Sequence, residues 1–329
     1  MSSAIRFSHP GPPDVLRLVP VERPEPGPRE VRIDVAAAGV NNADLLERRG
    51  HYPVPPNAPS GLGLEVAGTI GAVGRDVTEW RPGDRVCALV AGGGYAEETV
   101  APAAQVMPIP AGLSMVEAAA LPEVACTVYS NLAMIAGLKA GQAVLIHGAG
   151  GGIGSFAIQW ATAIGARVIT TAGSEAKTRA ALELGAVEAV NYRTDDFVSA
   201  TLAATDGRGV DAILDVVGTT YLRRNLECLA HDGHLVVIGG ALGPVTFDLG
   251  ELLSRRASIS ATLLRGRPAH QKAAIVAGVI RDVLPLVESG EIRAVVDTVF
   301  PLAEADRAHE LLESGRTVGK VVLETDHHH

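Results

Sequence analysis

The chain has 329 residues, of which 47% are hydrophobic and 20% are charged, a length that predicts two domains with a sizeable core. Its formal net charge is −9 and it carries no run of five basic residues, which argues against nucleic acid or an anionic membrane as a partner. No apolar run reaches about 18 residues and no N-terminal signal is recognisable, so we expect no membrane-spanning segment.

The three cysteines, Cys87, Cys126 and Cys228, show no spacing typical of a metal or redox motif. We expect each to be a structural thiol, in keeping with a reducing cytoplasm. Residues 326–329 end in His327–His329 and look like the remains of a purification tag, so they are left out of the fold.

Residues 1–122 lack helical periodicity and are broken by proline and glycine. Turn signals separate short β-type runs at 31–36, 65–73, 85–90 and 95–100, which predicts a mostly-β, barrel-like domain. One helix is expected at 42–49, with Asn41 or Asn42 as its N-cap. The C-terminal segment returns to this domain through a helix at 269–289 kinked or divided at Pro285, strands at 292–300 and 319–323, and a helix at 304–314.

A strand, a glycine turn and a helix follow one another between residues 144 and 161. The motif Ala149-x-Gly151-x-x-Gly154 is a variant of the triple-glycine fingerprint of dinucleotide-binding domains. Glycine lets the backbone approach a pyrophosphate closely, and the start of the following helix favours an anion. The pattern predicts a cofactor turn at Gly151, Gly152 and Ile153, the alternative being a glycine-rich turn with no ligand.

Strands and helices alternate from residue 123 to residue 265. We expect strands at 143–147, 167–171, 187–190, 210–216, 234–239 and 258–264, and helices at 152–164, 175–184, 195–205 and 219–230. Six strands with helical crossovers predict an α/β fold, a doubly wound parallel six-stranded Rossmann sheet with strand order 3-2-1-4-5-6.

The end of the second strand of this sheet indicates which dinucleotide is bound. Enzymes that use NAD usually carry an acid there for the ribose 2′-hydroxyl, and here none stands at the tip, although Glu175 is adjacent. A 2′-phosphate needs space, a hydroxyl and cations. These requirements favour NADPH, unless Lys177 is simply a solvated helix lysine. The residues that meet them are Gly173, Ser174, Lys177 and Tyr192, with Arg193 as a further cation.

Three segments, 40–44 (VNNAD), 48–53 and 61–68 (GLGLEVAG), resemble the medium-chain dehydrogenase/reductase superfamily. The nearest branch is that of the NADPH:quinone oxidoreductases, most closely the tumour-suppressor-inducible type, and the resemblance continues to Leu323. It implies a GroES-like catalytic and substrate domain formed by 1–122 and 266–325, and an NADPH-binding Rossmann domain at 123–265.

Zinc enzymes of this superfamily place a cysteine where Asn41 stands, a histidine where Leu64 stands and a second cysteine near Glu123. Asparagine and leucine do not supply the thiolate and imidazole that zinc requires. The four-cysteine structural lobe is also missing, because the chain runs directly from Arg85 to Tyr95. We therefore expect no metal, and we expect Glu65 to be a buried hydrogen-bonding group.

The resemblance also implies further cofactor contacts. They lie at the ends of later strands, where ligands of doubly wound sheets bind, and on the last strand. These family matches are Val217, Gly218, Ile238, Gly239, Leu263, Leu264 and Lys320. The edge strand 258–264 is implied to pair with its copy in a homodimer, which removes an exposed edge.

The reaction implied is hydride transfer from NADPH to a quinone, with ortho-quinones preferred and no zinc. Polar groups expected at the reacting centre are Asn41, Tyr52 and Thr127, of which Asn41 and Thr127 are also expected to contact the cofactor. No proton donor is identifiable from the sequence. Two alternatives stay open: reduction of an activated C=C bond in an enone or enoyl thioester, and a non-enzymatic NADPH-binding structural protein.

Overall fold

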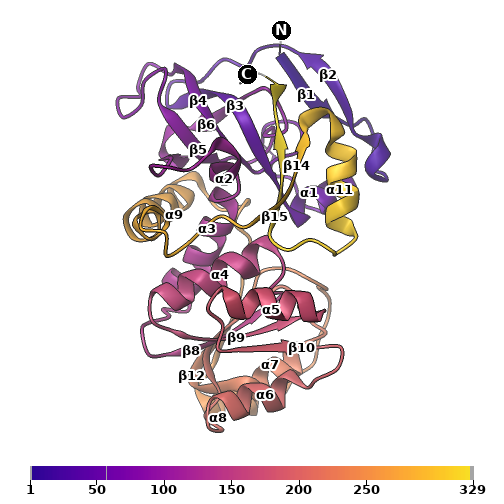
Figure 1. The fold of residues 1–329 in the computed structure, drawn as a ribbon, viewed down its shortest axis with the longest axis vertical. Helices are drawn as coiled ribbons and strands as arrows, with labels where there is room; N and C mark the ends of the chain where they lie inside the picture. Colours follow the sequence, from indigo (N-terminus) through magenta and orange to yellow (C-terminus); the bar gives the residue numbers. More distant parts are fainter. Residues whose placement is uncertain (1, 57, 327–329) are drawn as a thin grey trace. The chain divides into compact units, whose positions relative to one another are not determined.

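The computed structural model describes residues 2–56 and 58–326, and the chain forms two compact units (Figure 1). Unit 1 takes in the described parts of 1–126, 264–288 and 294–329. Unit 2 takes in 127–263 and 289–293. The histidines assigned to a tag, His327–His329, lie outside the described residues.

Unit 2 contains a parallel six-stranded sheet with the order β10-β9-β8-β11-β12-β13. Numbered within the sheet this is 3-2-1-4-5-6, so the expected topology is confirmed. The strands are β8 (Ala143–His147), β9 (Arg167–Ala172), β10 (Glu188–Asn191), β11 (Val210–Asp215), β12 (Leu229–Val237) and β13 (Ser258–Ala261).

Helices cover both faces of this sheet. In Figure 1, α4 and α5 lie on one side of the strands and α6, α7 and α8 on the other. Aliphatic side chains fill the space beneath them; Leu145, Ile169, Ile213 and Leu235 are all fully buried. The helices are α4 (Gly152–Ala163), α5 (Glu175–Glu183), α6 (Phe197–Ala204), α7 (Leu222–Cys228) and α8 (Leu249–Arg255).

Two strand boundaries in unit 2 differ by three or more residues from those expected. Strand β12 begins at Leu229 rather than at 234, because the chain pairs with β11 through an irregular register and passes Asp232 at a φ of +62°. Strand β13 ends at Ala261 rather than at 264, and Thr262 donates its hydroxyl to Asn131 instead. Helix α8 was not expected at all.

Unit 1 is built on a seven-stranded sheet with the order β14-β15-β3-β4-β5-β7, in which β6 pairs with β3. The pairs are antiparallel except β14 with β15. Strands β1 (Ser2–Arg6) and β2 (Arg17–Val21), which the sequence did not reveal, form a separate hairpin pair. The sheet strands are β3 (Glu30–Val40), β4 (Glu65–Val73), β5 (Arg85–Leu89), β6 (Glu98–Pro102), β7 (Val106–Pro108), β14 (Val296–Pro301) and β15 (Lys320–Glu324).

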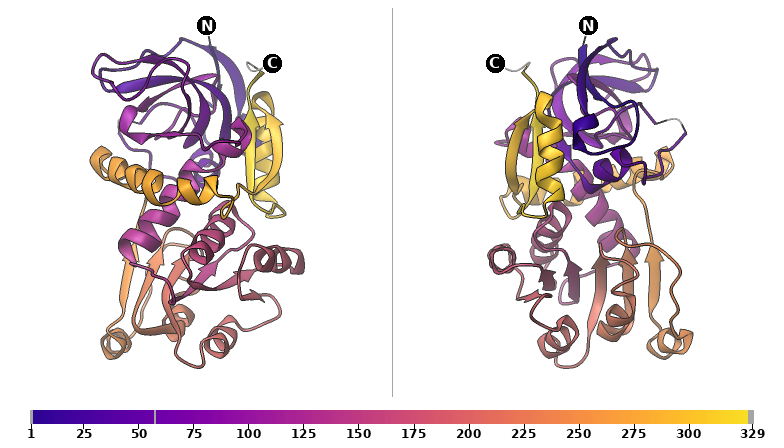
Figure 2. Two further views of the ribbon diagram at one scale, coloured as in Figure 1. Left: turned by 60° about the vertical axis from the view of Figure 1, so that its left-hand side comes forward. Right: turned by 90° about the vertical axis from the view of Figure 1, so that its right-hand side faces the viewer.

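Helices α1 (Asn42–Arg48), α2 (Met115–Ala119) and α11 (Ala305–Glu313) belong to unit 1, and α11 lies alongside β14 and β15 (Figure 2). The expected interruption by Pro285 is confirmed, since α9 (Ala269–Asp282) and α10 (Leu284–Glu288) are separate helices. Helix α3 (Pro122–Val128) continues into a π-helical segment, Tyr129–Ile135. Within the described ranges, no helix combines the length and apolar character needed to cross a membrane.

Candidate active site

The glycine turn of unit 2 joins the end of β8 to the start of α4. Gly151 is the N-cap of α4, in extended conformation, and the nearest atom to a Cβ built on it is the Gly148 carbonyl oxygen at 3.7 Å. A Cβ on Gly154 would lie only 2.2 Å from that same oxygen, so the helix packs directly on the turn. The first N–H groups of the helix, which include those of Gly152 and Ile153, lack intrahelical acceptors and are available to an anion.

The residues expected to read the 2′-position of the cofactor gather at the end of β9. Ser174 is the N-cap of α5 and accepts a hydrogen bond from the Lys177 backbone N–H. The Lys177 side chain runs across the glycine turn, where its Cδ would lie 2.5 Å from a Cβ on Gly150. A Cβ on Gly173 would lie 2.4 Å from the Tyr192 hydroxyl. A hydroxyl, a cation and a phenol therefore lie beside the turn, with no carboxylate at the strand tip.

The predicted residues after β11 and β12 are held together by Asp215. Its Oδ1 accepts hydrogen bonds from the backbone N–H groups of Val217 (2.6 Å) and Gly218 (3.1 Å). Its backbone oxygen accepts the N–H of Ile238. A Cβ on Gly239 would meet no atom within 4 Å, so this position borders open space.

Leu263 and Leu264 lie beyond the end of β13. The Leu263 side chain is 41% exposed and Leu264 is buried, and the boundary between the two units falls between them. The two leucines, both predicted as cofactor contacts, therefore differ in burial and belong to different units.

A buried polar chain behind these strand ends was not found from the sequence. His147 at the end of β8 contacts Thr171 through Nδ1 (2.9 Å) and Asn225 through Nε2 (2.7 Å), and Asn225 donates to Asp215 (3.0 Å). Burial lowers the pKa of His147 to about 4, so the ring is neutral at neutral pH. These hydrogen bonds link the carboxyl ends of β8, β9 and β11 to α7. In the sequence, the only sign of this network was a single histidine at the end of an apolar strand.

Unit 1 holds a second cluster, centred on Lys320 at the start of β15. Its ammonium nitrogen lies 2.5 Å from Glu65 Oε1 and 2.6 Å from Asn41 Oδ1, and it also donates to the Val40 carbonyl. The Asn41 amide donates to the same Glu65 oxygen (2.9 Å). Lys320 is 5% exposed and Glu65 is fully buried. Asn41 and Lys320, both predicted, are thus brought together, and Glu65 has the hydrogen-bonding role expected of it.

The other Glu65 oxygen, Oε2, accepts the backbone N–H of Glu123 (2.9 Å) at the start of α3. A Cβ on Gly39 would lie 2.2 Å from Oε1, so β3 approaches the carboxylate more closely than any other residue would allow. Both oxygens of Glu65 are therefore engaged by donors.

A second buried network lies behind this cluster. Asp44 accepts hydrogen bonds from the backbone N–H of Asn41 and of Gly63 and from the Tyr95 hydroxyl. Tyr95 in turn contacts His309 Nε2 (3.2 Å), and Arg48 donates to His309 Nδ1 (3.2 Å). Burial raises the pKa of Asp44 to about 6. Burial, together with the charges of Arg48 and Arg49, lowers the pKa of His309 to about 3. None of these partners was expected from the sequence.

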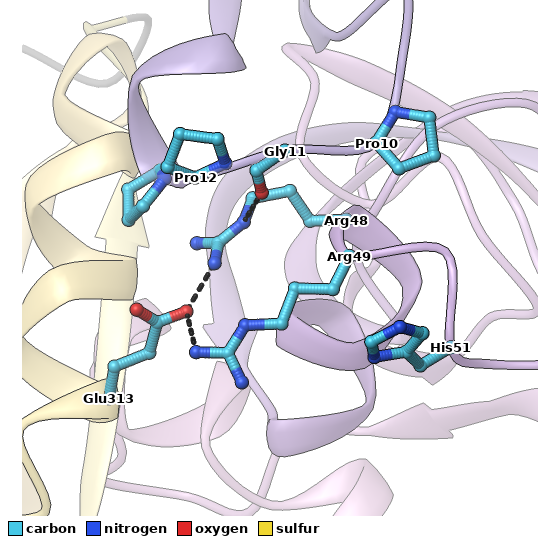
Figure 3. Close-up of a pocket in the computed structure, with 8 residues that line it drawn as sticks. Pro10, Gly11, Pro12, Arg48, Arg49, His51 and Glu313 are labelled. Carbon is cyan, nitrogen blue, oxygen red and sulfur yellow. Dashed lines mark hydrogen bonds and ion pairs between the residues drawn. The ribbon is translucent and has the colours of Figure 1, made fainter.

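The network reaches the surface at a pocket of about 420 Å³. In Figure 3 the guanidinium groups of Arg48 and Arg49 both point toward Glu313, with which they form ion pairs. The positive charge of this pocket is thereby partly neutralised within unit 1. Its lining residues are Pro10, Gly11, Pro12, Pro13, Arg48, Arg49, His51 and Glu313.

Tyr52 is half-buried, with the guanidinium carbon of Arg265 5.6 Å from its ring centroid. Arg265 is itself buried and pairs with Glu47 (2.5 Å). Thr127 is buried in α3, and its carbonyl accepts hydrogen bonds from Ser130 and Asn131. Tyr52 belongs to unit 1 and Thr127 is the first residue of unit 2.

Comparison with known proteins places this geometry in a family. Residues 27–111 match the alcohol dehydrogenase GroES-like domain and residues 184–323 match a zinc-binding dehydrogenase model. A quinone oxidoreductase of Pseudomonas aeruginosa is 38% identical, over 98% of this chain and 99% of its own. The chain belongs to the quinone oxidoreductase family of the medium-chain dehydrogenase/reductase superfamily.

Two solved structures share the whole architecture of this quinone oxidoreductase family member. The Escherichia coli quinone oxidoreductase complexed with NADPH is 35% identical, with a TM-score of 0.86 over 98% of this chain and 99% of that one. An NAD-dependent alcohol dehydrogenase is 33% identical, with a TM-score of 0.87 and the same coverage. The expected combination of a Rossmann sheet with a GroES-like domain is thereby confirmed.

Because residues 184–323 match the zinc-binding dehydrogenase family, we asked whether the residues of this chain could bind zinc. The Asn41 oxygen is held by Lys320, the Leu64 side chain is apolar and buried, and Glu65 is paired with the same ammonium. Across 2–56 and 58–326, no three His, Cys, Asp or Glu residues lie together as metal ligands would. A cationic side chain already lies among the available oxygens, so this donor set does not fit zinc.

Proposed function

We propose that this quinone oxidoreductase family member catalyses the NADPH-dependent reduction of quinones by hydride transfer, without zinc. Its similarity to quinone oxidoreductases over nearly the whole chain carries the proposal. NADPH would supply the hydride, and the protein's task is to bind and orient both reactants. A quinone spreads the added charge onto its oxygens, so no metal Lewis acid is required.

Unit 2 would bind the cofactor. The turn at Gly151 and the first N–H groups of α4 suit the pyrophosphate. Ser174, Lys177 and Tyr192 suit the 2′-phosphate, because they offer hydroxyls and a cation where enzymes specific for NAD carry an acid. The strand-end backbone fixed by Asp215 would contact the nicotinamide end. The predicted contacts at Ile153, Leu263 and Leu264 remain part of this proposal.

Unit 1 would bind the acceptor. Asn41 and Tyr52 are its polar and aromatic contacts, and Lys320 fixes the orientation of the Asn41 amide. Thr127 would contact the nicotinamide ribose. We include the preference for ortho-quinones, which rests on the resemblance of residues 41–74 to the inducible type, and a cytoplasmic location, which is supported by three cysteines that are all buried free thiols.

The test is NADPH oxidation by the purified protein with ortho-quinones, para-quinones and an enoyl thioester, each with and without a chelator, with NADH in parallel. Quinone-dependent, chelator-insensitive turnover that prefers NADPH supports the proposal. Turnover with the thioester alone would assign the activity to C=C reduction. Tight NADPH binding without any acceptor would indicate a non-enzymatic role.

We also propose a homodimer formed through β13. This strand is the edge of its sheet, with β12 as its partner among the strands described. The segment before β13 exposes three leucines, Leu242 (74%), Leu249 (70%) and Leu253 (80%), and we propose that the partner subunit covers them. Light scattering should report a dimer for the wild type and a monomer for Leu249→Glu/Leu253→Glu; a monomeric wild type would contradict the proposal.

A further inference from the structure

Four carboxyl groups of unit 1 interact with the proposed acceptor residues Asn41 or Tyr52, and the side chains of three of them are held by donors. Asp44 accepts three hydrogen bonds, Glu47 pairs with Arg265, and both oxygens of Glu65 are held by donors. The carboxyl oxygens that accept these hydrogen bonds are already occupied by donors of the protein.

Glu123 is the fourth carboxyl group and differs from the others. Its backbone N–H is fixed to Glu65 Oε2, which anchors the start of α3. Its side chain is half-buried, and within the described part of the chain its carboxyl oxygens accept no hydrogen bond. It thus combines an anchored backbone with a carboxyl group that is still open to a ligand.

The surroundings of Glu123 determine which form of its carboxyl is favoured. Burial is the largest influence and Glu65 is the next, and together they raise the pKa of Glu123 to about 8. Asp44 acts in the same direction, whereas Lys320 and Arg265 oppose it. The ionisable groups that interact with it from neighbouring elements are Glu65, Asp44, Lys320, Arg265, Tyr52 and Lys272. At neutral pH the carboxyl group therefore carries a proton.

We propose that Glu123 is the proton donor to the reduced acceptor, an inference that rests on the proposed quinone reductase activity. When a quinone takes up a hydride, the hydrogen ends on one of its two oxygens as an O–H group and the other oxygen becomes an oxyanion. The O–H bond of the Glu123 carboxyl group breaks, and its proton forms a new O–H bond on that oxygen. The products are a hydroquinone and a Glu123 carboxylate.

The same surroundings make the donor reusable. A charged Glu123 lies beside the charged Glu65, so its carboxylate is disfavoured and recovers a proton. Because the side chain is partly exposed, water can deliver that proton once the product has left. Lys320 and Arg265 moderate the negative charge between turnovers. A group with a pKa near the working pH suits this cycle.

The experiment compares Glu123→Gln, which cannot donate this proton, with Glu123→Asp, which retains a carboxyl group. Glu288→Gln, an exposed residue at the end of α10, is the matched control. In the wild type kcat should decline above about pH 8, as the Glu123 proton is lost. Glu123→Gln should lower kcat about a hundredfold at pH 7 and abolish that decline. Glu123→Asp should restore part of the rate and retain an alkaline decline.

The controls separate this inference from loss of structure or of the whole activity. NADPH binding and the thermal midpoint of Glu123→Gln should match those of the wild type. An unchanged kcat, or an alkaline decline that persists in Glu123→Gln, would overturn the inference while leaving quinone reduction intact. If Glu123→Gln does not fold, the pH profile of the wild type tests the inference by itself. A kcat that is constant from pH 7 to pH 9 would contradict the role of Glu123 as proton donor. Absence of quinone turnover in the wild type would overturn the proposed function itself.

Discussion

Lys320 and Glu65 are 255 positions apart in the sequence, yet the ammonium nitrogen of one lies 2.5 Å from Oε1 of the other. Asn41 binds both partners, so the three residues form a closed hydrogen-bonded triangle. This arrangement places a buried ammonium group against Asn41, the residue that stands where the family resemblance puts a zinc-ligating cysteine.

Removal of the cation should be costly. Lys320→Met leaves Glu65 buried and charged without its partner, which should lower the free energy of unfolding by about 3–5 kcal/mol. In Lys320→Met/Glu65→Gln no uncompensated charge remains, so most of this loss should be recovered. Urea denaturation measures both effects, with Lys139→Met on the surface as the control. A double variant no more stable than the single one would contradict the argument.

Two glycines of the cofactor turn should respond differently to the same methyl group. Gly154→Ala places a Cβ 2.2 Å from a backbone oxygen, so the thermal midpoint should fall. Gly151→Ala meets nothing closer than 3.7 Å and should fold normally, but its Cβ would obstruct the approach of a pyrophosphate. We expect its NADPH dissociation constant to rise at least about tenfold, or about 1.4 kcal/mol. Normal NADPH affinity in Gly151→Ala would show that the phosphate does not bind there.

Lys177 should distinguish the two nicotinamide cofactors. A charged hydrogen bond to the 2′-phosphate contributes about 1.5–3 kcal/mol, so Lys177→Gln should weaken NADPH binding roughly tenfold to a hundredfold. NADH lacks this phosphate, and its affinity should not change. Titration calorimetry with both cofactors provides the measurement. An equal loss of affinity for NADPH and NADH would indicate that Lys177 maintains the conformation of the glycine turn and does not bind the 2′-phosphate.

The buried His147 should make stability depend on pH. Its folded pKa of about 4 lies below the ordinary value of 6.5, so the unfolded chain binds more protons between these values. The contribution of His147 to the free energy of unfolding should therefore be complete above pH 6.5. It should be lost as the pH falls through 4, which lowers the free energy of unfolding by up to roughly 3 kcal/mol. His147→Gln should show a smaller loss between pH 6.5 and pH 4.5 in urea titrations. Identical slopes for the two proteins would argue against a neutral buried ring.

The architecture of unit 2 was predictable because its signals are local. The apolar run before His147, the glycines after it and the periodic helix that follows specify one βα unit, and the alternation of such units specifies the sheet. Boundaries failed where a tertiary contact overrides local preference. Leu229 continues a helical pattern in the sequence but pairs with Val210 of β11. The hydroxyl of Thr262 donates to Asn131 where the strand was expected to continue.

The sites were predictable to a different extent. The glycine turn and the group around Ser174 follow from short motifs, and Asn41 and Lys320 came from a family resemblance. The partners that hold them did not emerge, because Asp44, Tyr95 and His309 are brought together only by the folded sheet. In the sequence, Glu123 was noted only for its place near a zinc-ligating cysteine of the zinc enzymes. Its raised pKa comes from burial and from the neighbouring Glu65.

The dispersal of unit 1 along the chain has a consequence for synthesis on the ribosome. Most of unit 2 is one continuous stretch, 127–263, which can fold as soon as it emerges. Unit 1 needs residues from both ends of the chain: Glu65 is made early, and the lysine that neutralises it is made among the last ten described residues. The N-terminal part of the unit 1 sheet is therefore incomplete, and Glu65 lacks its cationic partner, until Lys320 has been synthesised.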